Sequence, residues 1–181
     1  MKPQDLTRIG LCVALTSVLA LISVPIPFSP VPITLSVAAV LISGLVLTPQ
    51  QALLSQFAYL LIAALGVPVL AGFSAGIPAI VGPTGGYLMA YPLMAYVVSL
   101  SQQLKIEDKR LQVIAFLASE VFAMLICYVL GTMWLAHSLQ ITISRALVLA
   151  VYPYLIGDAL KVAFVFSLHL TLKRTLSRAR G

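Results

Sequence analysis

Charged side chains are scarce in this sequence of 181 residues, of which only 9% are Asp, Glu, Lys or Arg, against about 25% in ordinary soluble domains. Between Arg8 and Lys105 there is no charged residue and no histidine. A soluble protein must cover its surface with polar groups, and a chain that is 61% hydrophobic cannot do so. The composition therefore excludes a soluble single-core domain and predicts one membrane-embedded domain over residues 1–181.

The sequence also lacks the usual patterns of metal, nucleotide and catalytic sites. Cys12 and Cys127 lie in apolar runs without CxxC spacing, and neither His137 nor His169 has a companion at metal-ligand spacing. No GxxxxGK[ST] loop is present, so energy for transport would have to come from another protein. The net charge of +6 comes from basic residues between and beyond the apolar runs, which does not indicate a nucleic-acid partner. We predict a protein that is not an enzyme and holds no metal or cofactor.

Apolar runs separated by proline, glycine or charge predict an all-α integral membrane protein with six spanning helices. The predicted helices cover residues 7–22, 33–47, 51–65, 84–100, 111–135 and 146–172.

The basic residues give an independent prediction of orientation. With six crossings, both termini and the second and fourth loops share one side of the membrane. That side would hold Lys2, Arg8, Lys105, Lys109, Arg110, Lys173, Arg174, Arg178 and Arg180. Arg145 would lie opposite. Under the positive-inside rule, both termini are expected in the cytoplasm, with the protein in the inner (cytoplasmic) cell membrane.

Two uncharged segments rich in proline and glycine, residues 23–32 and 66–86, are expected on the external side. Four prolines disfavour helix in the first, which should run extended or as turns. The second is longer than a simple helix connection requires, which favours a loop covering a pocket, with Phe73, Tyr87 and Tyr91 as candidate apolar surface. Alternatively, both segments merely connect helices along the headgroup region.

Two ionisable residues stand three apart in the last apolar run. Asp158 and Lys161 should share one helix face, and charges in hydrocarbon are costly enough to suggest a functional site. An ion pair that only fixes helix packing is the alternative. Counting along the helices places Glu120 at about the depth of Asp158, where it would reach Lys161; for Glu120 a structural role is favoured over direct ligand binding.

Four motifs of the sequence resemble those of the BioY family, the biotin-binding S components of energy-coupling-factor (ECF) transporters. They are PFSPVPITL (27–35), GVPV with AGFS (66–69 and 71–74), GPTGGYL (82–88), and Gly157-Asp158 with Lys161. The resemblance spans nearly the whole chain. It implies six helices in the S-component fold, an outward-facing pocket capped by loops, and high-affinity capture of biotin without catalysis.

Biotin offers a ureido ring, a thiophane ring and a valerate carboxylate. The resemblance implies that Asp158 accepts from the ureido N–H groups, and that Lys161 serves either the ureido carbonyl or the carboxylate. The further substrate-binding candidates are Phe73, Tyr87 and Tyr152 around the rings, and Thr84 and Gly86 in the loop.

The resemblance also implies partners, namely a transmembrane coupling protein and a pair of cytoplasmic ATPases that use ATP. Small residues on the first helix, Gly10 and Ala14, are the candidates for docking the coupling protein. Two other functions stay open: a proton-driven vitamin carrier acting alone through Glu120 and Asp158, and a membrane structural or assembly subunit.

Overall fold

The computed structural model describes residues 2–104 and 106–179 and is predominantly helical. Its helices are α1 (Pro3–Leu21), α2 (Ser36–Val46), α3 (Pro49–Ala64), α4 (Ile77–Val81), α5 (Gly85–Gln103), α6 (Lys109–Leu139), α7 (Ile143–Ala150) and α8 (Leu155–Ala179), with a 3-10 turn η1 (Ala71–Phe73). Two short strands, β1 (Ser23–Ile26) and β2 (Ser29–Thr34), lie between α1 and α2.

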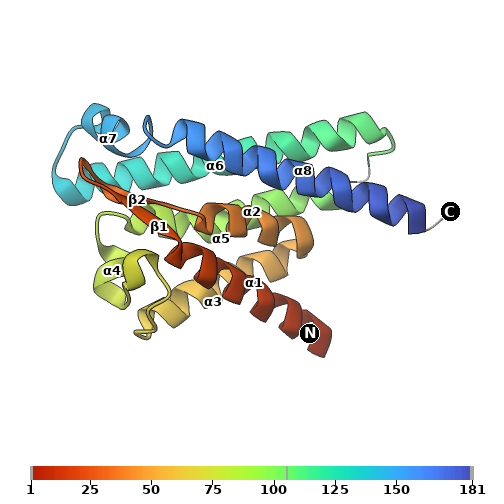
Figure 1. Ribbon diagram of the computed structural model, residues 1–181, viewed down its shortest axis with the longest axis horizontal. Coiled ribbons are helices and arrows are strands. Elements are labelled where there is room, and N and C mark those ends of the chain that lie inside the picture. The colour runs from red at the N-terminus through yellow and green to blue at the C-terminus, as the bar shows by residue number, and fades with distance from the viewer. Residues whose placement is uncertain (1, 105, 180–181) are drawn as a thin grey trace.

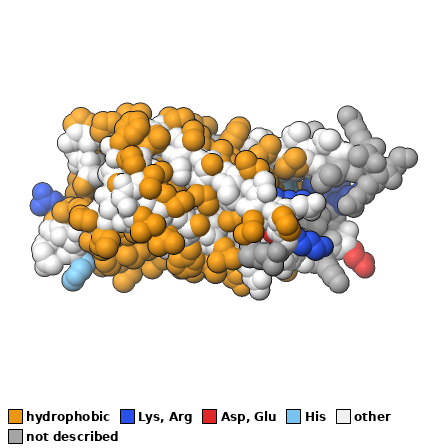
Figure 2. Space-filling model, turned by 90° about the horizontal axis from the view of Figure 1, so that it is seen from below, with side chains coloured by type: hydrophobic (Ala, Val, Ile, Leu, Met, Phe, Trp, Pro, Cys, Tyr) orange, Lys and Arg blue, Asp and Glu red, His pale blue; other side chains and the backbone are white. Residues whose placement is uncertain are grey.

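The long helices run roughly along one axis of an elongated bundle (Figure 1). Helix α5 packs against α2, α3 and α6, while α8 lies along α6 and α2. Both ends of the described chain and the α5–α6 connection lie toward one end of the bundle, and the β1–β2 hairpin and the α7–α8 turn lie toward the other (Figure 1). Figure 2 shows a broad hydrophobic surface between ends that carry the charged side chains. This distribution is typical of a protein embedded in a bilayer.

The proline-rich segment after α1 forms an antiparallel hairpin, in which Ser23 pairs with Thr34 and Val24 with Ile33. This confirms the prediction of extended backbone. It also shortens the second predicted helix, which begins at Ser36 rather than at residue 33, because residues 29–34 belong to β2.

The last predicted helix, residues 146–172, is wrong as a single element. The structure has α7 and α8 instead, joined by a turn over residues 151–154. Pro153 lies in this turn, has no N–H to donate, and disfavours helical backbone at the residue before it. The chain therefore changes direction there, and Tyr154 N donates to Val151 O, 3.0 Å away, to close the turn.

Within the described residues, three helical segments are long and apolar enough to span a membrane: Pro3–Leu21, Lys109–Leu139 and Leu155–Lys173. Most of each apolar window is not buried inside the bundle, which leaves apolar side chains facing outward. Helix α2 is apolar but shorter, at 11 residues. An integral membrane protein accounts for these surfaces.

Candidate functional site

A cavity of about 430 Å³ lies between the hairpin, the 66–84 loop and the adjoining parts of α5, α6 and α8. Its polar lining comprises Ser23, Thr34, Ser36, Ser74, Thr84, Tyr59, Tyr87, Tyr91, Tyr128, Tyr154, Asp158 and Lys161. The remaining lining is mostly apolar. A mostly apolar pocket with a few convergent polar groups is the usual form of a small-molecule site.

An ion pair and a tyrosine hydroxyl meet at the α6–α8 side of the cavity. Lys161 Nζ donates to Asp158 Oδ1 at 2.7 Å, and Tyr128 OH donates to Asp158 Oδ2 at 2.7 Å. Asp158 and Lys161 are only 7% and 9% exposed. Because each carboxylate oxygen has about two acceptor sites, both oxygens of Asp158 retain capacity for further donors. The arrangement is a preoriented hydrogen-bond acceptor beside a cation.

Tyrosine rings form much of the cavity wall, and their hydroxyls are tied to the surrounding helices. Tyr91 OH lies 2.7 Å from the Ser36 hydroxyl, and Tyr87 OH donates to Ala150 O at 3.4 Å. The Tyr87 ring also packs against α6 at Gly131, where a side chain would occupy the position of the ring. Fixed hydroxyls leave the ring faces as rigid apolar surface toward the cavity.

The rim of the cavity is joined to the helices by hydrogen bonds. Tyr154 OH contacts Val31 O and lies 2.9 Å from the Ser29 hydroxyl, so the α7–α8 turn holds the hairpin. On the other side, Gly72 N donates to the Ser23 hydroxyl at 3.2 Å. Gly72 has φ +65, a conformation that glycine adopts readily. The hairpin and the 66–84 loop therefore meet over the cavity.

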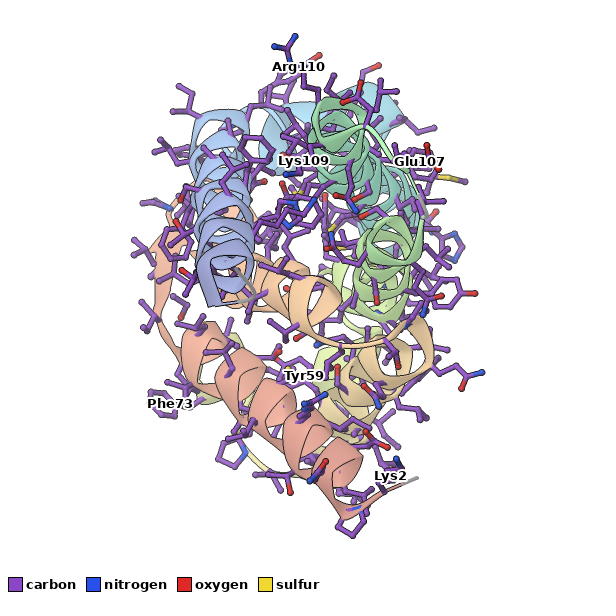
Figure 3. The ribbon with its side chains drawn as sticks, turned by 90° about the vertical axis from the view of Figure 1, so that its right-hand side faces the viewer. Lys2, Tyr59, Phe73, Glu107, Lys109 and Arg110 are labelled. Carbon is purple, nitrogen blue, oxygen red and sulfur yellow. The ribbon has the colours of Figure 1, made fainter. Side chains whose placement is uncertain are left out.

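Four of the seven predicted substrate-binding residues line the cavity: Asp158, Lys161, Tyr87 and Thr84. The other three lie outside the lining. Phe73 is 67% exposed and lies at the outer margin of the bundle, whereas Tyr59 lies inside it (Figure 3).

Tyr152 and Gly86 are placed elsewhere for identifiable reasons. The α7–α8 turn directs Tyr154 toward the hairpin and leaves Tyr152 59% exposed. Gly86 is a close-packing position, because a Cβ there would clash with Trp134 on α6. Trp134 Nε1 also donates to Gly82 O at 2.8 Å and thereby holds the Gly-rich segment on α6.

The predicted depth of Glu120 is wrong. Tyr128, not Glu120, lies at the level of Asp158, and two helical turns separate Tyr128 from Glu120 on α6. The ammonium of Lys161 pairs with Asp158. Helix α6 begins and ends beyond the predicted 111–135 limits and α8 begins after a break, so counting from predicted boundaries misjudged the level.

The two residues expected to dock a coupling protein, Gly10 and Ala14, are both exposed on α1. A side-chain carbon added at Gly10 would meet no described atom within 4 Å. Their face of the helix also carries exposed Leu11 and Val18. This face of α1 is thus an apolar surface on which two positions carry small side chains.

Sequence reasoning missed Tyr128 and chose Tyr152 over Tyr154. No signal in the sequence joins Tyr128 to Asp158, which lies 30 residues away on another helix. The tyrosine-proline-tyrosine run lies in the α7–α8 turn. Which of its two tyrosines faces the cavity depends on the direction of the turn, which the sequence does not show. Ser36 was also missed, although it follows directly on the PFSPVPITL motif.

The site is suited to binding a small uncharged ring system with hydrogen-bond donors. Asp158 supplies a buried acceptor, Lys161 a donor, and the tyrosine rings flat apolar walls. Among the described residues there is no group of three or more His, Cys, Asp or Glu side chains that could hold a metal ion.

Comparison with known proteins shows that the chain is similar to biotin transporters. The chain is 40% identical over 163 residues to the probable biotin transporter BioY of Pyrococcus horikoshii, covering 90% of this chain and 92% of the relative. It is 34% identical over 171 residues to the biotin transporter BioY of Thermotoga maritima, covering 94% and 96%. These relatives are transporters rather than enzymes.

A solved structure shares the fold. The crystal structure of the S-component for biotin from an ECF-type ABC transporter superposes with a TM-score of 0.82 at 25% sequence identity, covering 96% of this chain and 95% of that one. The model of the BioY family matches residues 1–178. The chain therefore belongs to the BioY family.

Proposed function

We propose that this protein captures biotin with high affinity as the substrate-binding S component of an ECF-type transporter. The observation that carries the proposal is the buried Asp158 carboxylate, held by Lys161 and Tyr128 at the wall of a tyrosine-lined cavity. A carboxylate in a low-dielectric site is a strong acceptor for N–H donors, and the two ureido N–H groups of biotin are such donors. The apolar walls match the fused rings.

Lys161 gives the site a second point of recognition. Its ammonium has three donors, of which one is used by Asp158. The remaining donors serve the ureido carbonyl or the valerate carboxylate, depending on which end of biotin lies beside Lys161. Biotin methyl ester, which lacks the free carboxylate, separates these two roles: if Lys161 serves the carboxylate, substitution of Lys161 reduces binding of biotin more than binding of the ester.

We further propose six membrane crossings with both termini in the cytoplasm, in the inner membrane. The gathering of both ends of the described chain and the α5–α6 connection at one end of the bundle supports placing both termini on the same side of the membrane (Figure 1), and the basic residues there favour the cytoplasmic side. The cavity then lies toward the outside of the cell, where biotin is captured.

Inward release needs an energy source that the sequence lacks, so the protein would act with a transmembrane coupling protein and a pair of cytoplasmic ATPases. The exposed α1 face at Gly10 and Ala14 is the proposed contact with the coupling protein. Two small residues four apart allow another helix to approach closely.

Radiolabelled biotin retained by the purified protein tests the capture function. We expect retention by the unmodified protein and by Glu107→Gln, a matched loss of one carboxylate at an exposed position. Asp158→Asn and Lys161→Ala should lose retention. If both variants fold and retain biotin like the unmodified protein, the ion pair only fixes packing and the proposal is wrong.

Uptake in cells with and without the ATPase and coupling subunits tests the partners. We expect uptake to depend on those subunits. Uptake that persists without them and collapses with the proton gradient would instead support a carrier acting alone.

A further inference from the structure

Two buried polar side chains lie outside the cavity and have no role in the proposed capture of biotin. Glu120 on α6 is 0% exposed, and neither of its carboxylate oxygens has a hydrogen-bond partner among the described residues. His169 on α8 is 2% exposed, and its Nε2 likewise has none. Buried polar groups without partners are costly and call for an explanation.

Contacts between α6 and α8 place these two side chains in the same part of the structure. The contacts are the Tyr128–Asp158 hydrogen bond of 2.7 Å, the Phe116–His169 ring stack with centroids 3.9 Å apart, and the Lys173–Gln112 hydrogen bond of 2.7 Å. Each step of about four residues along one helix is matched by a similar step along the other in the opposite direction. Glu120 therefore lies opposite Val165, one turn from the Phe116–His169 stack.

The direction of helical side chains brings the two groups closer still. The Cα–Cβ bond of a helical residue tilts toward the N-terminus of its own helix. Because α6 and α8 run in opposite directions, Glu120 leans toward the level of His169, and His169 leans toward the level of Glu120. The register thus places the two side chains within about one turn, or 6 Å, of each other along the α6–α8 interface, and among the described residues no hydrogen bond or ion pair joins them.

Electrostatics then fixes how many protons this pair holds. With one proton, the pair is neutral overall, either as a carboxylic acid beside imidazole or as a carboxylate beside imidazolium. With no proton or with two, one uncompensated charge stays in a low-dielectric interior. Two interacting groups of this kind titrate as a unit rather than separately.

Among the side chains that the structure describes, no other counter-charge lies at this level. On α8, Lys161 lies one turn beyond Val165 and is paired with Asp158, while Lys173 lies one turn beyond His169 and donates to Gln112. The charged residues of α6 are Lys109 and Arg110 at its start, three turns from Glu120. Helix α7 contributes Arg145 beyond the opposite end of α6, and neither α2 nor α5 contains a charged residue or histidine.

We propose that Glu120 and His169 form a proton-binding pair in the α6–α8 interface, in which one of the two groups carries one proton. A metal ion is not the expected occupant, because the described residues offer no third His, Cys, Asp or Glu ligand to the pair. The site lies between the cavity wall at Asp158 and Lys161 and the C-terminal end of α8, because residue 169 follows residue 161 along that helix. Gain or loss of this proton changes the net charge of the Glu120–His169 pair, about one to two helical turns along α8 from Lys161.

Spectroscopy on the purified protein at neutral pH tests this site directly. The chain has two histidines, so ¹⁵N-histidine labelling gives two sets of ring signals; His169→Gln assigns them, and exposed His137 serves as internal reference. The infrared difference between the unmodified protein and Glu120→Gln reports whether Glu120 is a carboxylic acid.

We expect one proton on the pair. Either a carboxylic-acid band disappears in Glu120→Gln and is shifted in His169→Gln, or an imidazolium signal of His169 disappears in Glu120→Gln. Glu107→Gln should change neither. Should Glu120→Gln fail to fold, Glu120→Asp keeps the acid and should retain one proton on the pair, with a displaced band or ring signal.

The proposal is overturned if neither group or both groups carry a proton, or if one group is indifferent to replacement of the other. Biotin takes no part in the measurement, so its outcome is independent of the proposed capture function.

Discussion

Changes at the Asp158–Lys161 ion pair should affect the stability of the protein and its affinity for biotin in different ways. Asp158→Asn leaves the Lys161 ammonium, which is only 9% exposed, without its counter-charge. Breaking a buried pair by removing one partner costs about 3–5 kcal/mol. The double variant Asp158→Asn with Lys161→Met removes both charges and keeps similar volumes, so most of this loss should be recovered.

Binding should behave differently from stability. A hydrogen bond to a charged group contributes about 1.5–3 kcal/mol, and each 1.4 kcal/mol is a tenfold change in affinity. Loss of one charge-assisted bond from a ureido N–H group to Asp158 should therefore raise the Kd for biotin at least about tenfold, and loss of two about a hundredfold. This loss should persist in the double variant.

Thermal unfolding in detergent and equilibrium binding of radiolabelled biotin measure the two quantities on the same preparation. We expect the single variant to be destabilised and weak in binding, and the double variant to be stable and still weak in binding. A double variant that binds biotin like the unmodified protein would refute the reasoning, because the pair would then contribute only to packing.

Two further predictions concern the rim and the wall of the cavity. Tyr154→Phe removes the hydroxyl that holds the hairpin at Ser29, so biotin should dissociate about tenfold faster, as measured by filter binding. Tyr152→Phe, at an exposed position, is the control. Equal dissociation rates in the two variants would contradict the role of Tyr154. Gly131→Ala places a carbon on the Tyr87 ring, and overpacking of this kind costs about 1–3 kcal/mol. We expect lower thermal stability and weaker biotin binding, and an unchanged protein would show that the ring is free to move.

Features that depend on neighbouring positions in the chain were predictable. The spacing of Asp158 and Lys161 brings any such pair together on one helix face, and the structure shows the contact at 2.7 Å. Four prolines in residues 23–32 disfavour helix, and the segment forms a hairpin. The scarcity of charge was enough to indicate the membrane class, because a surface that faces water needs polar side chains.

Prediction was less successful where the result depended on the exact ends of helices. A helix predicted as continuous over residues 146–172 breaks at Pro153, and the level of Glu120 shifted because depth was counted from inexact boundaries. An error of a few residues in a boundary is an error of several ångströms in depth, since each residue rises about 1.5 Å.

By itself, the sequence determined that this protein belongs in a membrane, that an acid and a base share one face of its last helix, and that its proline-rich segment is extended. These properties follow from composition and from spacing over three or four residues. Only the tertiary structure decided that Tyr128 holds Asp158, that Tyr154 rather than Tyr152 reaches the hairpin, and that Phe116 stacks on His169. Such contacts join residues far apart in the chain, so they depend on how the helices pack, and that register is a property of the whole bundle rather than of any one segment.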